Sequence, residues 1–467
     1  MPALGLSQVG AKGYLRPMPN IRIPRDLIEF ARVFRDAGHE AWFVGGAVRD
    51  SLLGREVSDY DLATDASPEK VLKLFRKVIP TGIKHGTVTV LWKGRSIETT
   101  TFRVEEGYSD GRHPDQVRFG VGIEEDLSRR DFTINAMAWN PLDSRLADPF
   151  GGRKDLGAKL VRAVGDASAR FDEDGLRLLR ALRFAAQLEF EVEESTLAAI
   201  GERKARISSV SPERIRDEFS KLLVSPRPSS ALRLMEEKGL LALILPELVA
   251  ARGVEQKGMH RFDVLDHLYL SVDAVLNRIG LRLAALFHDI GKPGTKAIGP
   301  DGIATFHRHE ELSATMAEAI LRRLRYPNDL IEEVCHLVHE HMFHYEDNWS
   351  DAAVRRFVAR AGISSIDDLL ALRIADGTAM TGHRVDPRSL DPLRRRIEAV
   401  IAAEEALSIR DLAIDGNDLA ALGVPRGPVM GRMLAELLEA VIEDPALNEA
   451  EKLKGIAARM KEKHGLT

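Results

Sequence analysis

The spacing of apolar residues changes along the chain and predicts two kinds of structure. Residues 59–64 and 87–92 alternate as strands do, and residues 96–102 are rich in β-branched side chains. Residues 41–48 form an apolar run that two glycines interrupt, so we expect a strand that turns into a helix. The pattern therefore predicts an α/β domain over residues 21–150.

Helical periodicity replaces the strand pattern after residues 148–156. Residues 171–188 carry apolar side chains at helical spacing, and similar patterns continue to the C-terminus. Ser211 followed by Pro212 predicts the start of a helix, with Ser211 as the cap and Pro212 as the first helical residue. We therefore expect a multidomain fold in which the α/β domain is followed by an all-α remainder without strands.

Composition is ordinary for a globular protein and changes this picture little. Hydrophobic residues make up 44% of the 467 residues, charged residues make up 29%, and the formal net charge is −5. That charge argues weakly against a nucleic-acid binder, because a local basic patch can lie on an acidic protein. Cys335 is the single cysteine, which excludes an intramolecular disulfide and favours a cytoplasmic location. No apolar run is long enough to cross a membrane, so no membrane partner is expected.

The first candidate for chemistry is a pair of glycines at the end of a predicted strand. Gly45 and Gly46 precede a predicted helix, and glycine there lets backbone N–H groups approach a phosphate closely. Arg49 lies one turn into that helix and can reach the same anion. The segment is therefore a candidate phosphate-binding turn.

Two carboxylates follow the glycine turn. Asp59 and Asp61 are one residue apart on a predicted strand, so their side chains share a face and form an all-oxygen site suited to Mg²⁺. Two such ions can activate a hydroxyl and stabilise a leaving pyrophosphate. Glu98, on a later predicted strand, is either a third carboxylate of this site or a charge on the strand surface.

Together, residues 45–66 resemble the signature of the class II nucleotidyltransferases of the polymerase-β superfamily. That family contains CCA-adding enzymes and bacterial poly(A) polymerases. The resemblance implies that Asp59 and Asp61 hold catalytic Mg²⁺. The residues that it places against the incoming nucleotide are Gly45, Gly46 and Arg49.

Further segments match the family in the same order, namely 129–138, 148–156, 173–184 and 211–219. They resemble its ribose and triphosphate motif, its hinge, its base-reading motif and the helix that braces that motif. The resemblance also implies that the loop 105–115 is a flexible element needed for the switch from C to A addition. The further nucleotide-binding residues that it implies are Arg112, Arg130, Asp131, Asn135, Asp174, Arg177, Arg180 and Arg183.

The base-reading motif has a chemical rationale of its own. Asp174 and Arg177 are three residues apart on a predicted helix, so we expect them on one face. A carboxylate accepts from the amino group of C or A, and a guanidinium donates to ring acceptors, whereas G and U present the wrong pattern. The alternative interpretation is a salt bridge on the helix surface.

A second candidate site is predicted in the helical part. His288 and Asp289 are adjacent within an apolar segment, and with His267 and Asp376 they resemble the ligand set of the HD phosphohydrolase superfamily. Imidazole and carboxylate ligands suit Mn²⁺, Ni²⁺, Co²⁺ or Fe²⁺. Two more histidines are candidates for a second metal, namely His309 and His341. The alternative for these histidines is an ordinary core or surface position.

The resemblances imply a domain order, a reaction and its partners. The predicted parts are a flexible lead (1–20), a nucleotidyltransferase head (21–150), a helical neck and body (151–255), an HD metal-binding domain (256–385) and a helical tail that binds tRNA (386–467). The implied reaction is the addition of C, C and A to the 3′ end of tRNA from CTP and ATP.

Three alternatives to this function remain open at the level of the sequence. A poly(A) polymerase is the first, although its usual basic tail and basic segment before the third strand are absent here. An enzyme that adds only CC or only A is the second. The third is a metal phosphohydrolase, acting on RNA ends, whose head only binds RNA. The HD domain itself is either a phosphohydrolase or a binding domain.

Overall fold

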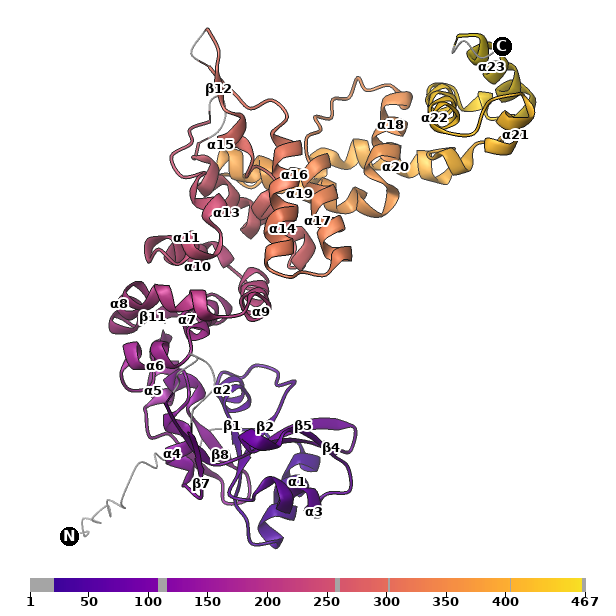
Figure 1. Cartoon of the computed structure of the whole chain (residues 1–467). Helices are drawn as coiled ribbons and strands as arrows, with labels where there is room; N and C mark the ends of the chain where they lie inside the picture. The colour runs from indigo at the N-terminus through magenta and orange to yellow at the C-terminus, as the bar shows by residue number, and fades with distance from the viewer. Residues whose placement is uncertain (1–20, 108–115, 257–260, 301–302, 404, 464–467) are drawn as a thin grey trace, which may run out of the picture. The chain divides into compact units, whose positions relative to one another are not determined.

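The chain folds into two compact units that divide between Val249 and Ala250 (Figure 1). The computed structural model describes residues 21–107, 116–256, 261–300, 303–403 and 405–463. The first unit begins with a mixed β-sheet, and helices dominate the rest of the chain, which confirms the predicted fold class. None of the helices in these described ranges is long and apolar enough to span a membrane.

The sheet of the first unit positions the carboxylate motif. Its strands lie in the order β3-β4-β5-β2-β1-β8-β9, and β2 pairs with β5 in parallel while the other pairs are antiparallel. The strand bounds are Ala41–Val44 for β1, Asp61–Thr64 for β2, Val78–Gly82 for β3, Thr87–Trp92 for β4, Arg95–Thr101 for β5, Ala138–Asn140 for β8 and Arg145–Ala147 for β9. The strands predicted around residues 87–92 and 96–102 are therefore confirmed.

Aromatic packing fixes α1 and α3 against the sheet. The helices of this region are α1 (Arg25–Asp36), α2 (Gly46–Leu52), α3 (Pro68–Leu74) and α4 (Ile123–Ser128). On α1, Phe30 and Phe34 contact Phe75, which follows α3, and Phe30 also contacts Trp92 at the end of β4, with ring centroids 4.8–5.6 Å apart. The glycine turn and the start of α2 follow β1 directly, as the sequence predicted.

The predicted helix over residues 171–188 is broken in the structure. It consists of α6 (Ala167–Glu173) and α7 (Leu176–Leu188), with Asp174 and Gly175 between them. Gly175 approaches a neighbouring segment so closely that an added Cβ would lie 2.3 Å from the carbonyl oxygen of Arg206. The break is thus set by tertiary packing rather than by the local hydrophobic pattern.

In the helical part of the first unit, two later helices pack against α7. Helix α9 begins at Pro212 with Ser211 at the cap position, as predicted, although the Ser211 side chain makes no capping hydrogen bond. Helix α7 packs against α9 and α10. The remaining bounds are Gly152–Ala158 for α5, Glu194–Arg203 for α8, Pro212–Leu223 for α9, Pro228–Glu237 for α10, Leu241–Ile244 for α11 and Pro246–Val249 for α12.

The prediction that strands end after the head is wrong in detail. Short paired strands occur later, because two adjacent segments can form a bridge without a strand-like hydrophobic pattern. These strands are β10 (Leu160–Val161) with β11 (Glu191–Val192), and β12 (Ala297–Ile298) with β13 (Ala304–Thr305). Within the head, β6 (Arg103–Glu106) and β7 (Gln116–Phe119) form a further antiparallel pair. The first two residues of the loop predicted over 105–115, Glu105 and Glu106, therefore belong to strand β6.

The second unit is built around packed helices that carry the histidine motif. Helix α13 packs against α14 and α19, α16 packs against α17, and α14 packs against α17. The bounds are Val264–Ala274 for α13, Ile279–Phe287 for α14, Lys292–Thr295 for α15, His309–Arg323 for α16, Asn328–Glu340 for α17, Asp351–Ala361 for α18, Ile366–Thr381 for α19 and Asp391–Ala402 for α20.

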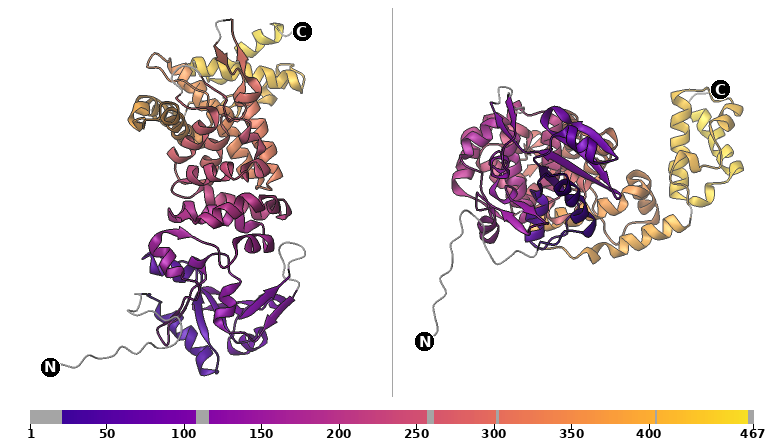
Figure 2. Two further views of the ribbon diagram at one scale, coloured as in Figure 1. Left: turned by 90° about the vertical axis from the view of Figure 1, so that its left-hand side faces the viewer. Right: turned by 90° about the horizontal axis from the view of Figure 1, so that it is seen from below.

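The last helices of the second unit, drawn in yellow in Figure 2, pack around a hydrophobic core of their own. They are α21 (Gly416–Ala421), α22 (Pro428–Glu443) and α23 (Ala450–Lys463), and they bury Leu419, Leu437 and Leu453. Arg355 on α18 donates to the carbonyl oxygens of Ile442 and Glu443 at 2.6 and 3.0 Å. These bonds cap the C-terminal end of α22, where carbonyl groups have no partner within the helix.

Two predictions fall outside the described residues: the flexible lead over 1–20 and the position of Arg112. The finer domain limits inside the two units stay predictions.

Candidate functional site

The predicted carboxylates lie at the start of β2 and on its parallel neighbour. Asp61 is the first residue of β2 and stands in register with Glu98 on β5 and with Val44 at the end of β1. Asp59 precedes the strand instead of lying on it, which corrects the predicted strand bounds. The side chains of Asp59, Asp61 and Glu98 are all exposed, so the sheet presents three carboxylates near one strand end. The sheet register thus favours the interpretation of Glu98 as a third member.

Partial burial and neighbouring carboxylates raise the pKa of Asp61. The side chain is open to solvent, yet protein atoms surround it densely; this partial burial, Glu98 and Asp59 together raise the pKa of Asp61 to about 6, against the lowering effect of Arg130. A carboxylate whose pKa is raised by like charges gains from a cation. Nevertheless, the described residues whose ligand atoms all lie within 4.8 Å of one another belong to the second unit only. The carboxylates of the first unit are therefore not a preassembled cluster.

The glycine turn lies under Arg130. Gly45 has a φ of 67°, which L side chains rarely adopt, and its N–H donates to the carbonyl oxygen of Met137 at 3.2 Å. A Cβ added at Gly45 would lie 3.1 Å from Nη1 of Arg130. Arg130 also lowers the pKa of Asp61 and contacts the buried Asp126 at 3.4 Å. One guanidinium therefore lies near both the turn and the carboxylates.

A continuous polar network joins the other predicted nucleotide-binding residues. Arg49 donates to Asn135 at 2.7 Å, and Asn135 donates to Asp131 at 3.1 Å. Arg180 makes two bonds to the far oxygen of Asp131, at 2.6 and 2.9 Å. Burial alone would raise the pKa of Asp131, but the charge and hydrogen bonds of Arg180 outweigh it and lower the pKa to about 2. The hydrogen bonds thus fix these side chains in place, and Asp131 is ionised at neutral pH.

Glu218 and Phe184 complete this network. Glu218 on α9 accepts from Arg180 at 3.3 Å and from Arg183 at 2.5 Å. The guanidinium carbons of Arg49, Arg180 and Arg183 lie 5.1, 5.4 and 3.7 Å from the centre of the Phe184 ring. Arg183 is 8% exposed and Arg180 is 31% exposed, so Arg180 offers more surface to a ligand, whereas Arg183 is a packing residue in this structure.

Asp174 and Arg177 are not two positions on one helix face, contrary to the prediction. Asp174 lies in the break before α7, and both of its oxygens accept from Arg214 on α9, at 3.1 and 2.7 Å. Its Oδ1 also accepts the N–H of Leu176 at 3.0 Å. A carboxylate has about four lone-pair positions, so one acceptor position remains for a ligand. The bracing helix predicted from residues 211–219 therefore acts through Arg214.

Arg177 is held from several sides. It donates to Glu173 at 2.5 Å and to the carbonyl oxygens of Arg170 and Arg129 at 3.2 and 3.0 Å. A guanidinium has about five N–H donors, so two remain for other partners. Because its bonds reach from α7 to the segment before Asp131, Arg177 ties the base-reading motif to the triphosphate motif.

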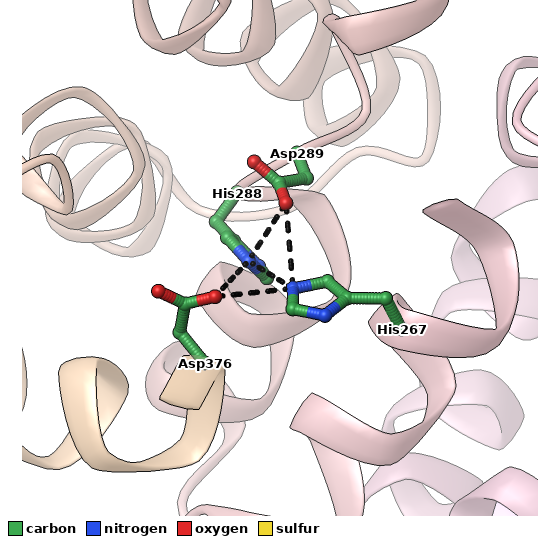
Figure 3. A group of neighbouring side chains, drawn as sticks. All are labelled: His267, His288, Asp289 and Asp376. Carbon is green, nitrogen blue, oxygen red and sulfur yellow. Dashed lines mark hydrogen bonds and ion pairs between the residues drawn. The ribbon is translucent and has the colours of Figure 1, made fainter. Parts of the chain in front are cut away.

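The four predicted HD ligands converge in the second unit (Figure 3). His267 comes from α13, His288 and Asp289 directly follow α14, and Asp376 comes from α19. The two histidine Nε2 atoms lie 3.1 Å apart, and each lies 3.3 Å from Oδ2 of Asp289. Asp376 Oδ1 lies 3.2 Å from His267 Nε2. The set is almost fully buried, with Asp376 the most open at 13% exposure.

The same backbone contact orients three of the histidines in this unit. Nδ1 of His288, His309 and His341 lies 3.0, 2.7 and 2.7 Å from a carbonyl oxygen three residues earlier. A carbonyl accepts only from a protonated Nδ1, so each neutral ring presents the Nε2 lone pair to the centre. Burial lowers the pKa of His288, but Asp289 and Asp376 outweigh it and raise the pKa to about 10. The centre therefore favours a positive charge.

Asp289 joins a second group to the first. Its Oδ1 lies 3.0 Å from Nε2 of His309 and 3.6 Å from Nε2 of His341, whereas its Oδ2 faces His267 and His288. Both predicted additional ligands are thus brought to the cluster, and they have donor atoms within 4.8 Å of one another. One carboxylate with ligands on both sides is an arrangement that can hold two metals.

Several residues that contact these sites were not predicted from the sequence. Lys292 donates to Asp289 at 2.6 Å and to Gln256 at 2.6 Å, and its position three residues after Asp289 was a usable signal. Arg214 and Glu218 come from the bracing helix, where the charge pattern alone does not show which side chain faces inward.

Family models match three parts of the chain. Residues 41–162 match the poly A polymerase head domain, residues 189–252 match the probable RNA and SrmB-binding site of polymerase A, and residues 301–457 match domain 2 of tRNA nucleotidyltransferase.

Known CCA-adding enzymes are similar to this chain along almost its whole length. The CCA-adding enzyme of Lactobacillus johnsonii is 37% identical over 87% of this chain and 90% of its own length. That of Anoxybacillus flavithermus is 34% identical over 92% of this chain and 96% of its own. The crystal structure of the Bacillus stearothermophilus CCA-adding enzyme in complex with CTP is 30% identical, with a TM-score of 0.72 over 94% of this chain and 98% of that one. The chain belongs to the family of CCA-adding enzymes.

Proposed function

We propose that this protein adds C, C and A to the 3′ end of tRNA, using CTP and ATP. In each step the 3′-hydroxyl oxygen of the RNA bonds to the α-phosphorus of the nucleotide. The bond between that phosphorus and the bridging oxygen breaks, pyrophosphate leaves, and the hydroxyl proton is lost. The observation that carries the proposal is the set of carboxylates near the start of β2 and on its neighbour β5, close to the glycine turn, in a member of this family.

The carboxylates fit Mg²⁺ better than a transition metal. Asp59, Asp61 and Glu98 supply only oxygen, they are exposed, and crowding raises the pKa of Asp61, so a cation is favoured there. Mg²⁺ usually takes one or two carboxylates together with substrate phosphates and water, which suits ligands that are not preassembled. When bound, it would make the hydroxyl more acidic and stabilise the leaving pyrophosphate.

The side chains around the carboxylates have separate tasks in the proposal. The backbone at Gly45 and Gly46 and the guanidinium of Arg130 bind the triphosphate, since Arg130 lies so close to the turn that a Cβ at Gly45 would be 3.1 Å from it. Arg49, Asn135 and Asp131 form a bonded series that keeps the ribose and triphosphate region rigid. Rigid, preformed contacts lower the entropic cost of bringing the reacting atoms together.

Base choice is proposed to rest on Asp174 and Arg177. The remaining acceptor position on Asp174 suits the amino group of C or A, and the remaining donors of Arg177 suit ring acceptors. Arg214 fixes the orientation of this carboxylate through one bond to each of its oxygens. A site built in this way rejects U and G because its polar atoms are left unpaired.

Nucleotide addition to defined RNA tests the proposal. The protein is incubated with tRNA that lacks the CCA end, with Mg²⁺, and with CTP, ATP or both, and the product ends are sequenced. Addition of CC with CTP alone and of CCA with both supports the proposal. A poly(A) tail, CC alone with both nucleotides, or no addition to this tRNA together with addition of A to CC-ended tRNA would each assign the chain to another activity.

A second activity is proposed for the histidine cluster, namely metal-dependent hydrolysis of phosphate esters on RNA ends. The four ligands His267, His288, Asp289 and Asp376 would hold a transition metal, because buried Nε2 atoms and carboxylates converge at a centre that favours a positive charge. A metal there supplies an activated water and polarises the phosphate. Lys292 holds Asp289 in place through its bond to Oδ2.

Elemental analysis and a phosphatase assay test this second proposal. The purified protein should contain Mn, Ni, Co or Fe in a near-stoichiometric amount. It should release phosphate from RNA with a 3′-phosphate or open a 2′,3′-cyclic phosphate, and adding Ni²⁺ or Co²⁺ should raise the rate. A protein that binds the metal but hydrolyses neither end would have a binding domain there instead.

A further inference from the structure

A cavity in the first unit is lined by none of the residues assigned to a site above. It has a volume of about 690 Å³ and lies between the C-terminal end of α2, the loop that follows it, α5 and the segment before α1. Three of its lining residues are charged, and all three are arginines: Arg22, Arg55 and Arg153. We call this cavity the arginine pocket.

The arginine pocket has no counter-charge of its own. No carboxylate lines it, and within the described residues neither Arg22 nor Arg153 makes a side-chain hydrogen bond or ion pair. Arg55 makes one, to the carbonyl oxygen of Gln187 at 3.3 Å, which ties the pocket to the end of α7. Elsewhere in this unit the arginines of the polar network are matched by Asp131 and Glu218. Unmatched guanidinium groups around one cavity repel one another and favour an anion.

The rest of the lining suits a nucleotide rather than a bare ion. Leu52, Leu53 and Leu156 supply an apolar wall, and Ser51 supplies a hydroxyl. Guanidinium groups pair well with phosphate oxygens, and an apolar wall covers the face of a base. A volume of this size is in the range of small-molecule sites, of roughly 300–1,000 Å³.

We infer that the arginine pocket binds a phosphodiester of the RNA substrate, with the neighbouring base against the leucine wall. This inference rests on the proposed function, because it takes tRNA as the substrate. None of the predicted nucleotide-binding residues lines the pocket, so it is a second phosphate site in the same unit. Two lining residues, Val57 and Tyr60, flank Asp59 closely in the chain. An RNA strand held here therefore contacts the segment that carries the catalytic carboxylates.

Removal of the two unpaired arginines tests the inference. In the full-length protein, Arg22→Gln with Arg153→Gln removes two charges without breaking a contact. Affinity for tRNA lacking the CCA end is measured by fluorescence anisotropy over a series of KCl concentrations. Each lost phosphate contact lowers the slope of log Kd against log [KCl] by about one, so we expect a slope shallower by about two. The KM for CTP should change by less than about twofold, because the incoming nucleotide binds elsewhere.

A filled pocket gives an independent variant. Gly157 lies in α5 with a helical backbone, and a Cβ added there meets no atom within 4 Å. Gly157→Leu should therefore fold at least as well as the wild type and weaken tRNA binding without removing a charge. Arg32→Gln is the matched control, since Arg32 is an exposed arginine on α1 outside the pocket. It should leave tRNA affinity within about twofold of wild type, although it changes the net charge by one.

The outcomes separate this inference from the proposed function. A wild-type salt slope in the double variant would overturn the inference, even if the enzyme adds CCA normally. A raised KM for CTP or ATP with unchanged tRNA binding would also overturn it, because the pocket would then hold a free nucleotide. Failure of the wild type to extend tRNA would overturn the proposed function instead, while the binding measurement would still report whether the pocket holds RNA.

Discussion

The two candidate sites of this chain place their ligands in opposite ways. In the first unit, Asp59, Asp61 and Glu98 are exposed oxygen ligands near one strand end. In the second unit, buried histidines and aspartates bring ligand atoms within 4.8 Å of one another. The first site is open to ligands that arrive with a substrate. The second is complete before any substrate binds.

The difference follows from what each arrangement costs. Exposed carboxylates keep part of their hydration, so partial burial and mutual repulsion raise the pKa of Asp61 without requiring a preassembled partner. Buried polar groups lose hydration, so they are stable only when paired or bound to a cation. We therefore expect a loosely bound, exchangeable Mg²⁺ in the first unit and a tightly held metal in the second.

The largest expected effect is the loss of nucleotide addition in Asp61→Ala. Removing one carboxylate of a two-metal site costs several kcal/mol of transition-state stabilisation, which is about a thousandfold or more in rate. Single-turnover incorporation of CTP into tRNA measures it. Asp59→Ala should behave in the same way.

The control for this variant is Asp36→Ala, which removes an exposed carboxylate at the end of α1. It should incorporate CTP at the wild-type rate. In Asp61→Ala the metal content of the second unit should stay unchanged, which would separate the two sites. Near-normal incorporation by Asp61→Ala would show that the reaction uses other ligands.

The next effect is the loss of tightly bound metal from His267→Asn with His288→Asn. Two of the four first-group ligands are then missing, so elemental analysis should show less than about a tenth of the wild-type transition metal. Phosphohydrolase activity should fall with it. The histidines are replaced and Asp289 is kept, because Asp289→Ala would leave the buried Lys292, now 2.6 Å from that carboxylate, without its counter-charge.

His383→Asn controls for the loss of a histidine in this unit, because His383 is exposed and its side chain makes no hydrogen bond to the described residues. Its metal content should equal that of wild type. Full metal occupancy in the double variant would mean that the metal is bound by other residues.

A smaller effect is expected on fidelity. Asp174→Ala should raise misincorporation of U or G by roughly 10- to 100-fold, because the acceptor for the amino group is gone. Arg214→Gln should give part of this effect, since the Asp174 carboxylate loses the bidentate partner that orients it. Competition between CTP and UTP on one tRNA measures the ratio.

Asp172→Ala is the matched control for Asp174. Asp172 lies two positions earlier, is 49% exposed, and makes only surface ion pairs with Arg203 and Arg206. It should select C over U as wild type does. Unchanged selection in Asp174→Ala would place base reading on other residues.

The smallest effect is a gain of stability in Asp61→Asn. The folded state raises the pKa of Asp61 from 3.8 to about 6, so it binds the proton more tightly than the unfolded chain does. The ionised form therefore lowers the free energy of unfolding above pH 6, and this penalty disappears as the pH falls below the unfolded pKa. Without added divalent metal, Asn should raise Tm by about 2–4 °C at pH 8 at most, since solvent screens the exposed group, and by almost nothing at pH 4. An equal gain at both pH values would show that the charge is not its cause.

The sequence predicted the elements that depend on local pattern. Strand β4 has the predicted bounds Thr87–Trp92, and α2 begins at Gly46, because alternation and paired glycines are short-range signals. The break at Asp174 and Gly175 was missed, since the apolar spacing continues through it. The Asp-Gly pair was a turn signal that could have revealed the break.

Site membership was easier to predict than site geometry. All four HD ligands were named from the sequence, and the structure brings them together. The bridging position of Asp289 and the bond from Arg214 to Asp174 were not predictable, because they depend on contacts between residues 20 to 52 positions apart in the chain. The arginine pocket likewise results from tertiary packing of α2, α5 and the segment before α1.

We expect the exposed carboxylates to support CCA addition without help from the buried histidine cluster. The most direct test uses the His267→Asn/His288→Asn variant after elemental analysis has shown that it carries no transition metal. It is given tRNA without the CCA end, Mg²⁺, CTP and ATP, and the 3′ ends are sequenced over time. We predict complete CCA ends, formed at the wild-type rate. Unextended tRNA, or ends that carry only CC, only A or a run of A, from a correctly folded variant would contradict the claim.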